Sequence, residues 1–174
     1  NDYMQIGRAY YQAKNFTKAE ETFTTVTQKF PDNLQAYVML ARTYSQRDPD
    51  TKRGIARPKF EQVINKASVD PIKYSDEMME AFGYLAYYYL SKENYNQANA
   101  YYDRMINLDP NNKEYQARGY TGKANVSLRM IDLVKEADEK LPYVERSLNY
   151  YNKVLELDPN NRSARSSIQY VSSI

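Results

Sequence analysis

Residues 94–112 read NYNQANAYYDRMINLDPNN, a pattern that predicts one amphipathic helix followed by a stop. Asn94 is placed to cap the first turn, because an asparagine side chain accepts a hydrogen bond from the free N–H groups at a helix start. Ala98 and Tyr102 follow at helical spacing and share a face with the apolar residues after them. Pro110 ends the pattern, since proline cannot continue a helix interior and restricts the residue before it.

The same pattern occurs three times in the chain. Residues 15–33 read NFTKAEETFTTVTQKFPDN, and residues 143–161 read YVERSLNYYNKVLELDPNN. Aligned with residues 94–112, they share a small, an aromatic and an apolar position and a closing proline: Ala19, Ala98 and Ser147; Phe23, Tyr102 and Tyr151; Val26, Met105 and Val154; Pro31, Pro110 and Pro159. A helical unit that recurs in this way predicts a helical solenoid.

The composition excludes several kinds of site. The 174 residues include no Cys and no His, which removes disulfides, thiolate and imidazole metal ligands, and Ser-His-Asp or Cys-His catalysis. The 24 basic and 22 acidic residues give a net charge of +2, too balanced for a dedicated binder of nucleic acid or of a membrane surface. No apolar run approaches the roughly 20 residues of a membrane span. We therefore expect no cofactor and no metal.

The chain begins at Asn1, without Met and directly inside a helical pattern. We expect a processed chain or a piece of a longer protein, from which any targeting segment would be missing. Abundant Tyr, Asn and Lys without Cys also resemble repeat proteins of bacterial cell envelopes.

The first unit carries a resemblance to a known family. The spacing Tyr3-x2-Ile6-Gly7-x2-Tyr10, then Ala19-x3-Phe23 and then Pro31, resembles the tetratricopeptide repeat pattern W-x2-L-G-x2-Y, A-x3-F, P over 34 residues, with Tyr in place of the opening Trp. The resemblance implies an all-α, right-handed superhelix of antiparallel helix pairs. Gly in mid-helix costs about 1 kcal/mol against Ala, so Gly7 predicts the close approach of a second helix.

We expect one repeat domain over residues 1–174, divided into about four units and a terminal helix: 1–33, 34–74, 75–112, 113–161 and 162–174. In the second unit, a long turn at residues 48–51 separates the first helix from Ala56-x3-Phe60-x2-Val63. In the terminal helix, Ala164, Ile168 and Val171 either cover the last unit or begin a further repeat.

The fourth unit is distorted, because Pro110 and Pro159 are 49 residues apart rather than 34. Tyr120, Ala124 and Ser127 predict its first helix, although Gly119 and Gly122 leave the register open by about one turn. Residues 135–140 (KEADEK) predict a solvated turn, after which Tyr143 begins the second helix.

In this family the first helix of each unit lines a concave surface that takes a segment of another protein. Carried over by motif, the lining residues are Met4, Arg8, Tyr11, Gln12, Val38, Arg42, Gln46 and Tyr87. Arg8 and Arg42 are equivalent, one repeat apart, and together could hold carboxylates of an acidic peptide. Alternatively, both arginines are solvated or pair within the solenoid. One subfamily grips the terminal carboxylate of heat-shock chaperones with Lys and Asn, but this chain has Met4, Arg8 and Met39 there, so that partner is not expected.

These observations predict a protein–protein interaction scaffold. The alternative is a structural spacer or self-association module of a longer protein, with an exposed apolar end near Tyr3 and Ile6 or near Ile168 and Val171. Binding of single-stranded nucleic acid needs a basic lining in every unit, and the third unit supplies none.

An enzyme is not expected, because the carboxylates Asp76, Glu77 and Glu80 lack any other catalytic partner type. The tyrosine cluster around Tyr84 and Tyr102 is interpreted as packing rather than as a platform for sugars or bases.

Overall fold

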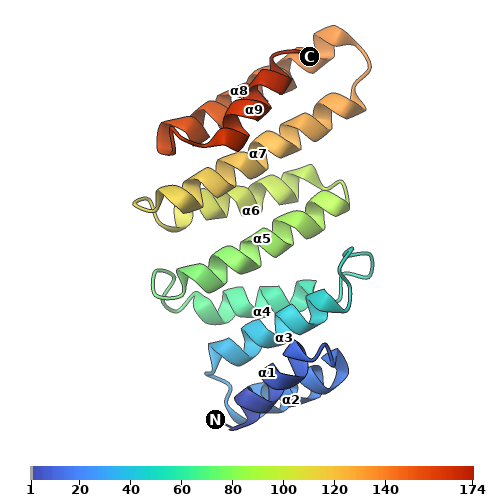
Figure 1. Cartoon of the computed structure of the whole chain (residues 1–174), viewed down its shortest axis with the longest axis vertical. Coiled ribbons are helices and arrows are strands. Elements are labelled where there is room, and N and C mark those ends of the chain that lie inside the picture. Colours follow the sequence, from blue (N-terminus) through green and yellow to red (C-terminus); the bar gives the residue numbers. More distant parts are fainter. Residues whose placement is uncertain (1) are drawn as a thin grey trace. The chain divides into compact units, whose positions relative to one another are not determined.

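The computed structural model describes residues 2–174, which form nine α-helices and no β-strand (Figure 1). The expectation that Asn1 lies within a helix falls outside these residues. The helices are α1 (Asp2–Gln12), α2 (Phe16–Lys29), α3 (Leu34–Gln46), α4 (Arg57–Ala67), α5 (Ser75–Ser91), α6 (Tyr95–Leu108), α7 (Lys113–Leu133), α8 (Ala137–Leu157) and α9 (Arg162–Val171). Across the same residues, no helix has both the length and the hydrophobicity needed to cross a bilayer.

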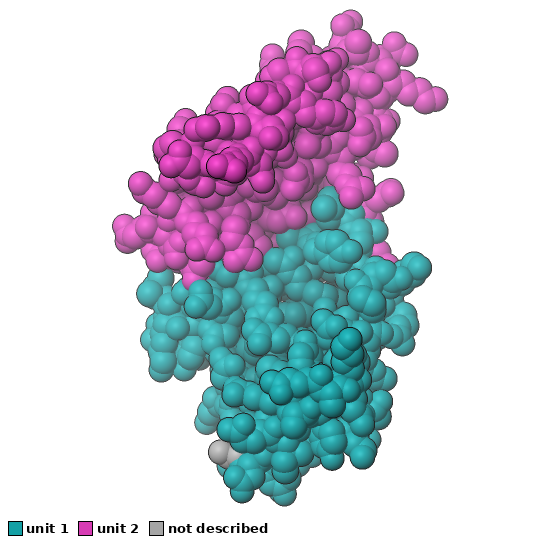
Figure 2. Space-filling view, in the orientation of Figure 1, with its two compact units in different colours: residues 1–91 teal, residues 92–174 magenta. Residues whose placement is uncertain are grey.

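The backbone divides into two compact units, residues 1–91 and residues 92–174 (Figure 2). Unit 1 contains α1 to α5 and unit 2 contains α6 to α9. Within each unit every helix packs against the next one in sequence, and α1 also contacts α3. This nearest-neighbour packing is the local connectivity of a helical repeat protein.

Asparagine caps five of the helices. The side chains of Asn15, Asn33, Asn94, Asn112 and Asn161 each accept a hydrogen bond from a backbone N–H in the first turn that follows. In α6, the Oδ1 atom of Asn94 lies 3.1 Å from the N of Gln97, as the sequence predicts. Such caps stabilise a helix by about 1 kcal/mol each and fix where each helix begins.

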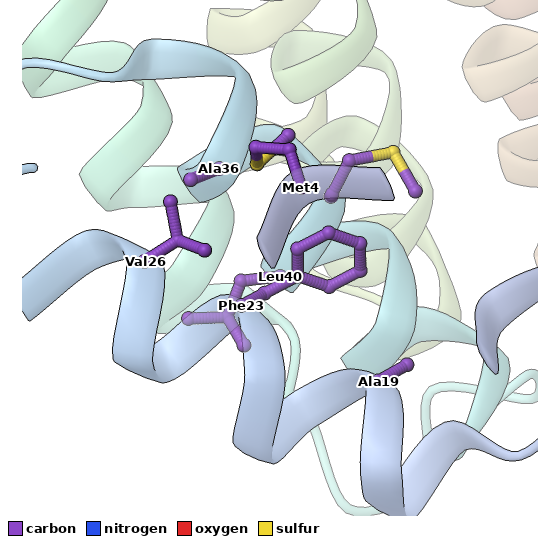
Figure 3. Packing of buried hydrophobic residues seen from close by; sticks show 7 residues of the cluster. Met4, Ala19, Phe23, Val26, Ala36 and Leu40 are labelled. Atoms are coloured by element: carbon purple, nitrogen blue, oxygen red, sulfur yellow. The ribbon is translucent and has the colours of Figure 1, made fainter. Parts of the chain in front are cut away.

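Phe23 lies at the centre of the core of unit 1 (Figure 3). Its side chain has no exposed surface, and it packs in one cluster with Met4, Val26 and Leu40. Gly7 makes this packing possible, because a Cβ atom at that position would lie 2.6 Å from Cε1 of Phe23. The predicted close approach of a second helix at Gly7 is therefore confirmed.

The long turn between α3 and α4 is built around Asp48. Its carboxylate accepts hydrogen bonds from the backbone N–H groups of Gly54 (2.7 Å) and Arg53 (3.2 Å). Burial opposes ionisation of this carboxyl, but the backbone N–H groups outweigh it and lower the pKa of Asp48 below 3.8. Gly54 has a φ of +67°, which glycine adopts without the steric cost of a side chain.

In unit 2, α7 and α8 are the two longest helices, at 21 residues each. The residue excess in the fourth unit therefore lengthens both helices. The prediction that residues 135–140 form a turn and that Tyr143 begins the helix is wrong, because α8 already begins at Ala137. Asp138 and Glu139 then occupy its first turn, where the positive end of the helix dipole stabilises acidic side chains.

The register of α7 places its small residues on two sides. Gly119 and Gly122 both face α6, where a Cβ atom at Gly122 would overlap the ring of Tyr102. Ala124 instead faces α8, is fully buried, and accepts a hydrogen bond at its carbonyl from the Ser147 hydroxyl at 3.3 Å. Gly7 faces the following helix α2, so neither Gly119 nor Gly122 is its counterpart. The prediction that Ala124 belongs to the buried face of this first helix is confirmed.

The terminal helix α9 packs against α8. Ala164 and Val171 are buried in one cluster with Tyr151 and Val154 of α8. The apolar stripe of α9 thus packs on the last helix pair, as α3 packs on α2, which both interpretations drawn from the sequence require.

Candidate functional site

All eight predicted lining residues lie on α1, α3 and α5, which are the first helices of their repeats and belong to unit 1. Side-chain hydrogen bonds join α3 to α5: Nε2 of Gln35 donates to Oε1 of Glu77 at 2.7 Å, and Arg42 donates to Glu80. Together with the contact between α1 and α3, these bonds place the first helices beside one another within unit 1.

Met4 and Val38 do not contribute to an exposed surface. Met4 is 8% exposed and Val38 is 1% exposed, so the prediction that these side chains line an open face is corrected. Met4 points into the cluster around Phe23 (Figure 3), whereas Ile6 is 46% exposed. The buried face of α1 is therefore rotated toward Met4.

The remaining lining residues apart from Arg42 reach the solvent. Arg8, Gln12 and Gln46 are exposed, and Tyr87 is 51% exposed. Tyr11 is half-buried, with its ring edge-on to Phe16 at a centroid distance of 5.7 Å. We call these five residues (Arg8, Tyr11, Gln12, Gln46 and Tyr87) the first-helix face of unit 1.

Arg42 is engaged within the repeats. Its Nε and Nη2 atoms each lie 2.6 Å from a carboxylate oxygen of Glu80, which is a bidentate ion pair. The hydrogen bond to Glu80 raises the pKa of Arg42 and outweighs the lowering effect of burial. Because the two side chains are 43% and 32% exposed, solvent limits the worth of this pair to about 1 kcal/mol. Its main effect is to fix the orientation of α3 against α5.

Arg8 has no such partner, although it is the repeat equivalent of Arg42. Within residues 2–174, Arg8 forms no ion pair or side-chain hydrogen bond. Glu80 stands two residues before Phe82, and the equivalent residue before Tyr37 is Gln35, a neutral carboxamide. Gln35 is itself bonded to Glu77. Therefore α5 supplies a carboxylate, Glu80, to Arg42 of α3. At the equivalent position α3 has the neutral Gln35, so it supplies no carboxylate to Arg8 of α1.

The acidic residues of α5 have structural partners. Glu77 accepts from Gln35, and Glu80 accepts from Arg42. Among the described residues, no group of three or more His, Cys, Asp or Glu side chains is arranged to hold a metal ion.

Tyr84, at the centre of the tyrosine cluster, stacks on Phe60 with a centroid distance of 4.3 Å. Its burial raises its pKa to about 12. This ring therefore takes part in packing, as interpreted from the sequence.

The sequence did not indicate a pocket of about 340 Å³ in unit 2 between α6, α7 and α8. It is lined by Tyr95, Asn96, Asn99, Lys123, Val126, Ser127, Met130, Tyr143, Arg146 and Tyr150. The only sequence signal for it was the residue excess in the fourth unit, since that excess lengthens α7 and α8 beside the start of α6.

The family called "Tetratricopeptide repeat" matches this chain twice, at residues 3–33 and at residues 75–112. The first match covers α1 and α2, and the second covers α5 and α6. A comparison with curated proteins finds no match.

The solved structures that are similar to this chain include a repeat protein of Cytophaga hutchinsonii, MamA and PilF. The C-terminal part of a TPR repeat-containing protein from Cytophaga hutchinsonii is 36% identical over 67% of this chain, with a TM-score of 0.62, and this chain spans 45% of that structure. The MamA protein is 18% identical, with coverage of 98% of this chain and 79% of MamA and a TM-score of 0.69. PilF of Pseudomonas aeruginosa is 18% identical, with coverage of 98% of this chain and 66% of PilF and a TM-score of 0.63. At 18% identity, the last two likenesses show the fold alone, an all-helical repeat solenoid.

Proposed function

Because this chain is a tetratricopeptide repeat protein, a member of a family of generally non-catalytic interaction modules, we propose that it binds a partner protein through the first-helix face of unit 1. The partner contributes a short segment that orders on this face. The chain supplies a rigid surface and performs no chemistry of its own.

The difference between Arg8 and Arg42 carries this proposal. Arg42 already has a bidentate carboxylate from Glu80, while Arg8 is exposed and has none within residues 2–174. A guanidinium offers a planar pair of donors that matches a carboxylate, so an acidic side chain of the partner complements Arg8. The same bond that Glu80 makes to Arg42 within the chain would be made to Arg8 by the partner.

Exposed aromatic residues supply the apolar part of the contact. Tyr87 is 51% exposed on α5, and Tyr11 is half-buried on α1. Tyr and Arg are the residues that most often dominate the binding energy of protein interfaces. Gln12 and Gln46 add carboxamides that can pair with the backbone of an extended segment. The preferred ligand is therefore a peptide with an acidic residue beside an apolar one.

A displayed peptide library, selected against the full chain, tests the proposal. We expect enriched sequences to carry Asp or Glu, and we expect Arg8→Glu to abolish their binding. Arg118→Glu is the matched control, because it reverses the charge of another exposed helical arginine in unit 2 and should leave binding intact. Enrichment without acidic residues, or equal loss in both variants, would overturn the assignment.

A second candidate function is self-association through the outer side of α1 and α2. Tyr3 is 43% and Ile6 is 46% exposed, while Leu40, the repeat equivalent of Ile6, is 3% exposed where α3 packs on α2. Tyr3, Ile6 and Tyr10 also line a pocket of about 340 Å³ with residues of α2. Sedimentation velocity over a concentration series distinguishes the two functions. A mass that rises with concentration and returns to that of a monomer in Ile6→Asp favours self-association, and a monomer throughout counts against it.

A further inference from the structure

The pocket in unit 2 exists because α7 and α8 are long. At about 1.5 Å per residue, the 21 residues of α7 span about 31 Å, while the 14 residues of α6 span about 21 Å. α7 is therefore about 10 Å longer than α6, and Met130 in its last turn lines the pocket together with Tyr95 and Asn96 of the first turn of α6. The side chains of α8 form the third wall.

Each of the three helices presents one face to this pocket. Lys123, Val126, Ser127 and Met130 lie at positions i, i+3, i+4 and i+7 of α7 and so share one face, and Tyr143, Arg146 and Tyr150 of α8 are spaced by three and four residues. Three tyrosine rings form much of the apolar wall. A volume of about 340 Å³ is at the lower end of the range for sites that bind small ligands or single side chains.

The lining contains two cations, Lys123 and Arg146, and no carboxylate. Lys123 already pairs with Asp103, and this pairing raises its pKa although burial opposes it. Arg146 lies over the ring of Tyr143, with Cζ 5.5 Å from the centroid, and meets no carboxylate among the described residues. The cation available to a ligand is therefore Arg146.

Asn99 provides a second, independent observation that points to a ligand site. Its Oδ1 atom is buried and accepts no hydrogen bond within the described part of the chain. A buried acceptor without a donor costs about 1–3 kcal/mol, so native proteins rarely leave one unsatisfied. Tyr95 and Asn96 in the first turn of α6 also line this pocket, so the positive end of the helix dipole lies at the same wall.

We propose that this pocket binds one acidic residue of a peptide. The carboxylate of that residue pairs with Arg146, and its backbone N–H donates to Oδ1 of Asn99. Its methylene groups lie against Tyr95 and Tyr143. This site lies wholly in unit 2 and does not depend on the first-helix face of unit 1. A ligand with a donor and a carboxylate together satisfies both unmet groups of the pocket, Arg146 and Oδ1 of Asn99.

Methionine methyl groups give a direct readout. Met130 lines the pocket and is half-buried, whereas the other five methionines of the chain are at most 8% exposed: Met4, Met39, Met78, Met79 and Met105. The full chain, labelled at the methionine methyl carbon, is titrated with N-acetyl-glutamate amide and, separately, with N-acetyl-glutamine amide. Met130→Leu assigns the signal. A ligand of this size binds with a Kd of about 1 mM or weaker.

We expect N-acetyl-glutamate amide, but not N-acetyl-glutamine amide, to shift the Met130 methyl signal. Arg146→Gln should weaken this binding about tenfold or more, because it removes a charged hydrogen bond, and Asn99→Leu should weaken it as well. Arg118→Gln, on the exposed side of α7, and Arg8→Glu, in unit 1, should leave it unchanged. No shift with either compound, equal shifts with both, or a shift that survives Arg146→Gln would overturn the proposal. Loss in Arg8→Glu would place the binding in unit 1.

Discussion

Replacing Gly7 by Ala tests the packing of unit 1 at its tightest contact. The new Cβ atom would lie 2.6 Å from Cε1 of Phe23 and 2.9 Å from two further ring carbons. Favourable carbon contacts are about 3.5–4.0 Å, so the ring would have to move by about 1 Å. Phe23 has no exposed surface and packs in one cluster with Met4, Val26 and Leu40, which opposes this movement.

Two opposing effects determine how much Gly7→Ala changes the free energy of unfolding. Overpacking of a filled core costs about 1–3 kcal/mol, and exchange of Gly for Ala within a helix returns about 1 kcal/mol. Gly7→Ala should therefore lower the free energy of unfolding by about 1 kcal/mol. In a Phe23→Leu background, Cε1 and the rest of the outer ring are gone, so the helix-propensity gain remains and the same change should raise the free energy by about 1 kcal/mol.

The assay is urea unfolding followed by far-ultraviolet circular dichroism, for the wild type, both single variants and the double variant. With a slope near 2 kcal/mol per molar urea, each effect shifts the midpoint by about 0.5 M, in opposite directions in the two backgrounds. The coupling between the two sites should be about 2 kcal/mol. If Gly7→Ala stabilises the protein equally in both backgrounds, Gly7 is not in close contact with Phe23 and the register between α1 and α2 is wrong.

Three further predictions concern other elements. Asn94→Ala should lower the free energy of unfolding by about 1 kcal/mol by removing the cap of α6, and hydrogen exchange should show this first at the amide of Gln97; unchanged exchange there would contradict the cap. Gly122→Ala should destabilise unit 2 because its Cβ atom would overlap the ring of Tyr102, and Tyr102→Leu should relieve the cost in a double-variant urea titration; an additive result would contradict the contact. The lowered pKa of Asp48 means that its carboxylate stabilises the turn above the ordinary aspartate pKa and that this stability is lost as the pH falls through the lower folded value. The amide resonance of Gly54 should therefore titrate with a midpoint below 3.8, and a midpoint above that value would contradict the hydrogen bonds to Asp48.

The repeat pattern predicted the helices and most of the core. Ala19, Phe23 and Val26 are all fully buried, and the same holds within a few percent for Tyr151 and Val154 in the third copy of the pattern. These positions are determined locally, because each apolar face follows the helical period and each helix starts at an asparagine cap. The family resemblance rested on the same residues, and it is confirmed by the two family matches.

The parts that sequence reasoning missed depend on contacts between helices. Met4 was placed on the lining and is buried, because the packing of α1 against both α2 and α3 fixes how far the helix is rotated. The pairing of Arg42 with Glu80 joins residues 38 positions apart, which no local pattern shows. The early start of α8 was missed because the charged run at residues 135–140 was interpreted as a turn. Acidic residues are also favourable in the first turn of a helix.

A charge-swap measurement tests the proposed interaction most directly. The affinity of the selected acidic peptide, and of the same peptide with its acidic residue changed to Lys, is measured against the wild type and against Arg8→Glu. We expect that Arg8→Glu alone and the Lys peptide alone each weaken binding. The combination of Arg8→Glu with the Lys peptide should recover most of the affinity. If the double change is as weak as or weaker than either single change, the acidic residue does not pair with Arg8, and the first-helix face of unit 1 is not the binding surface.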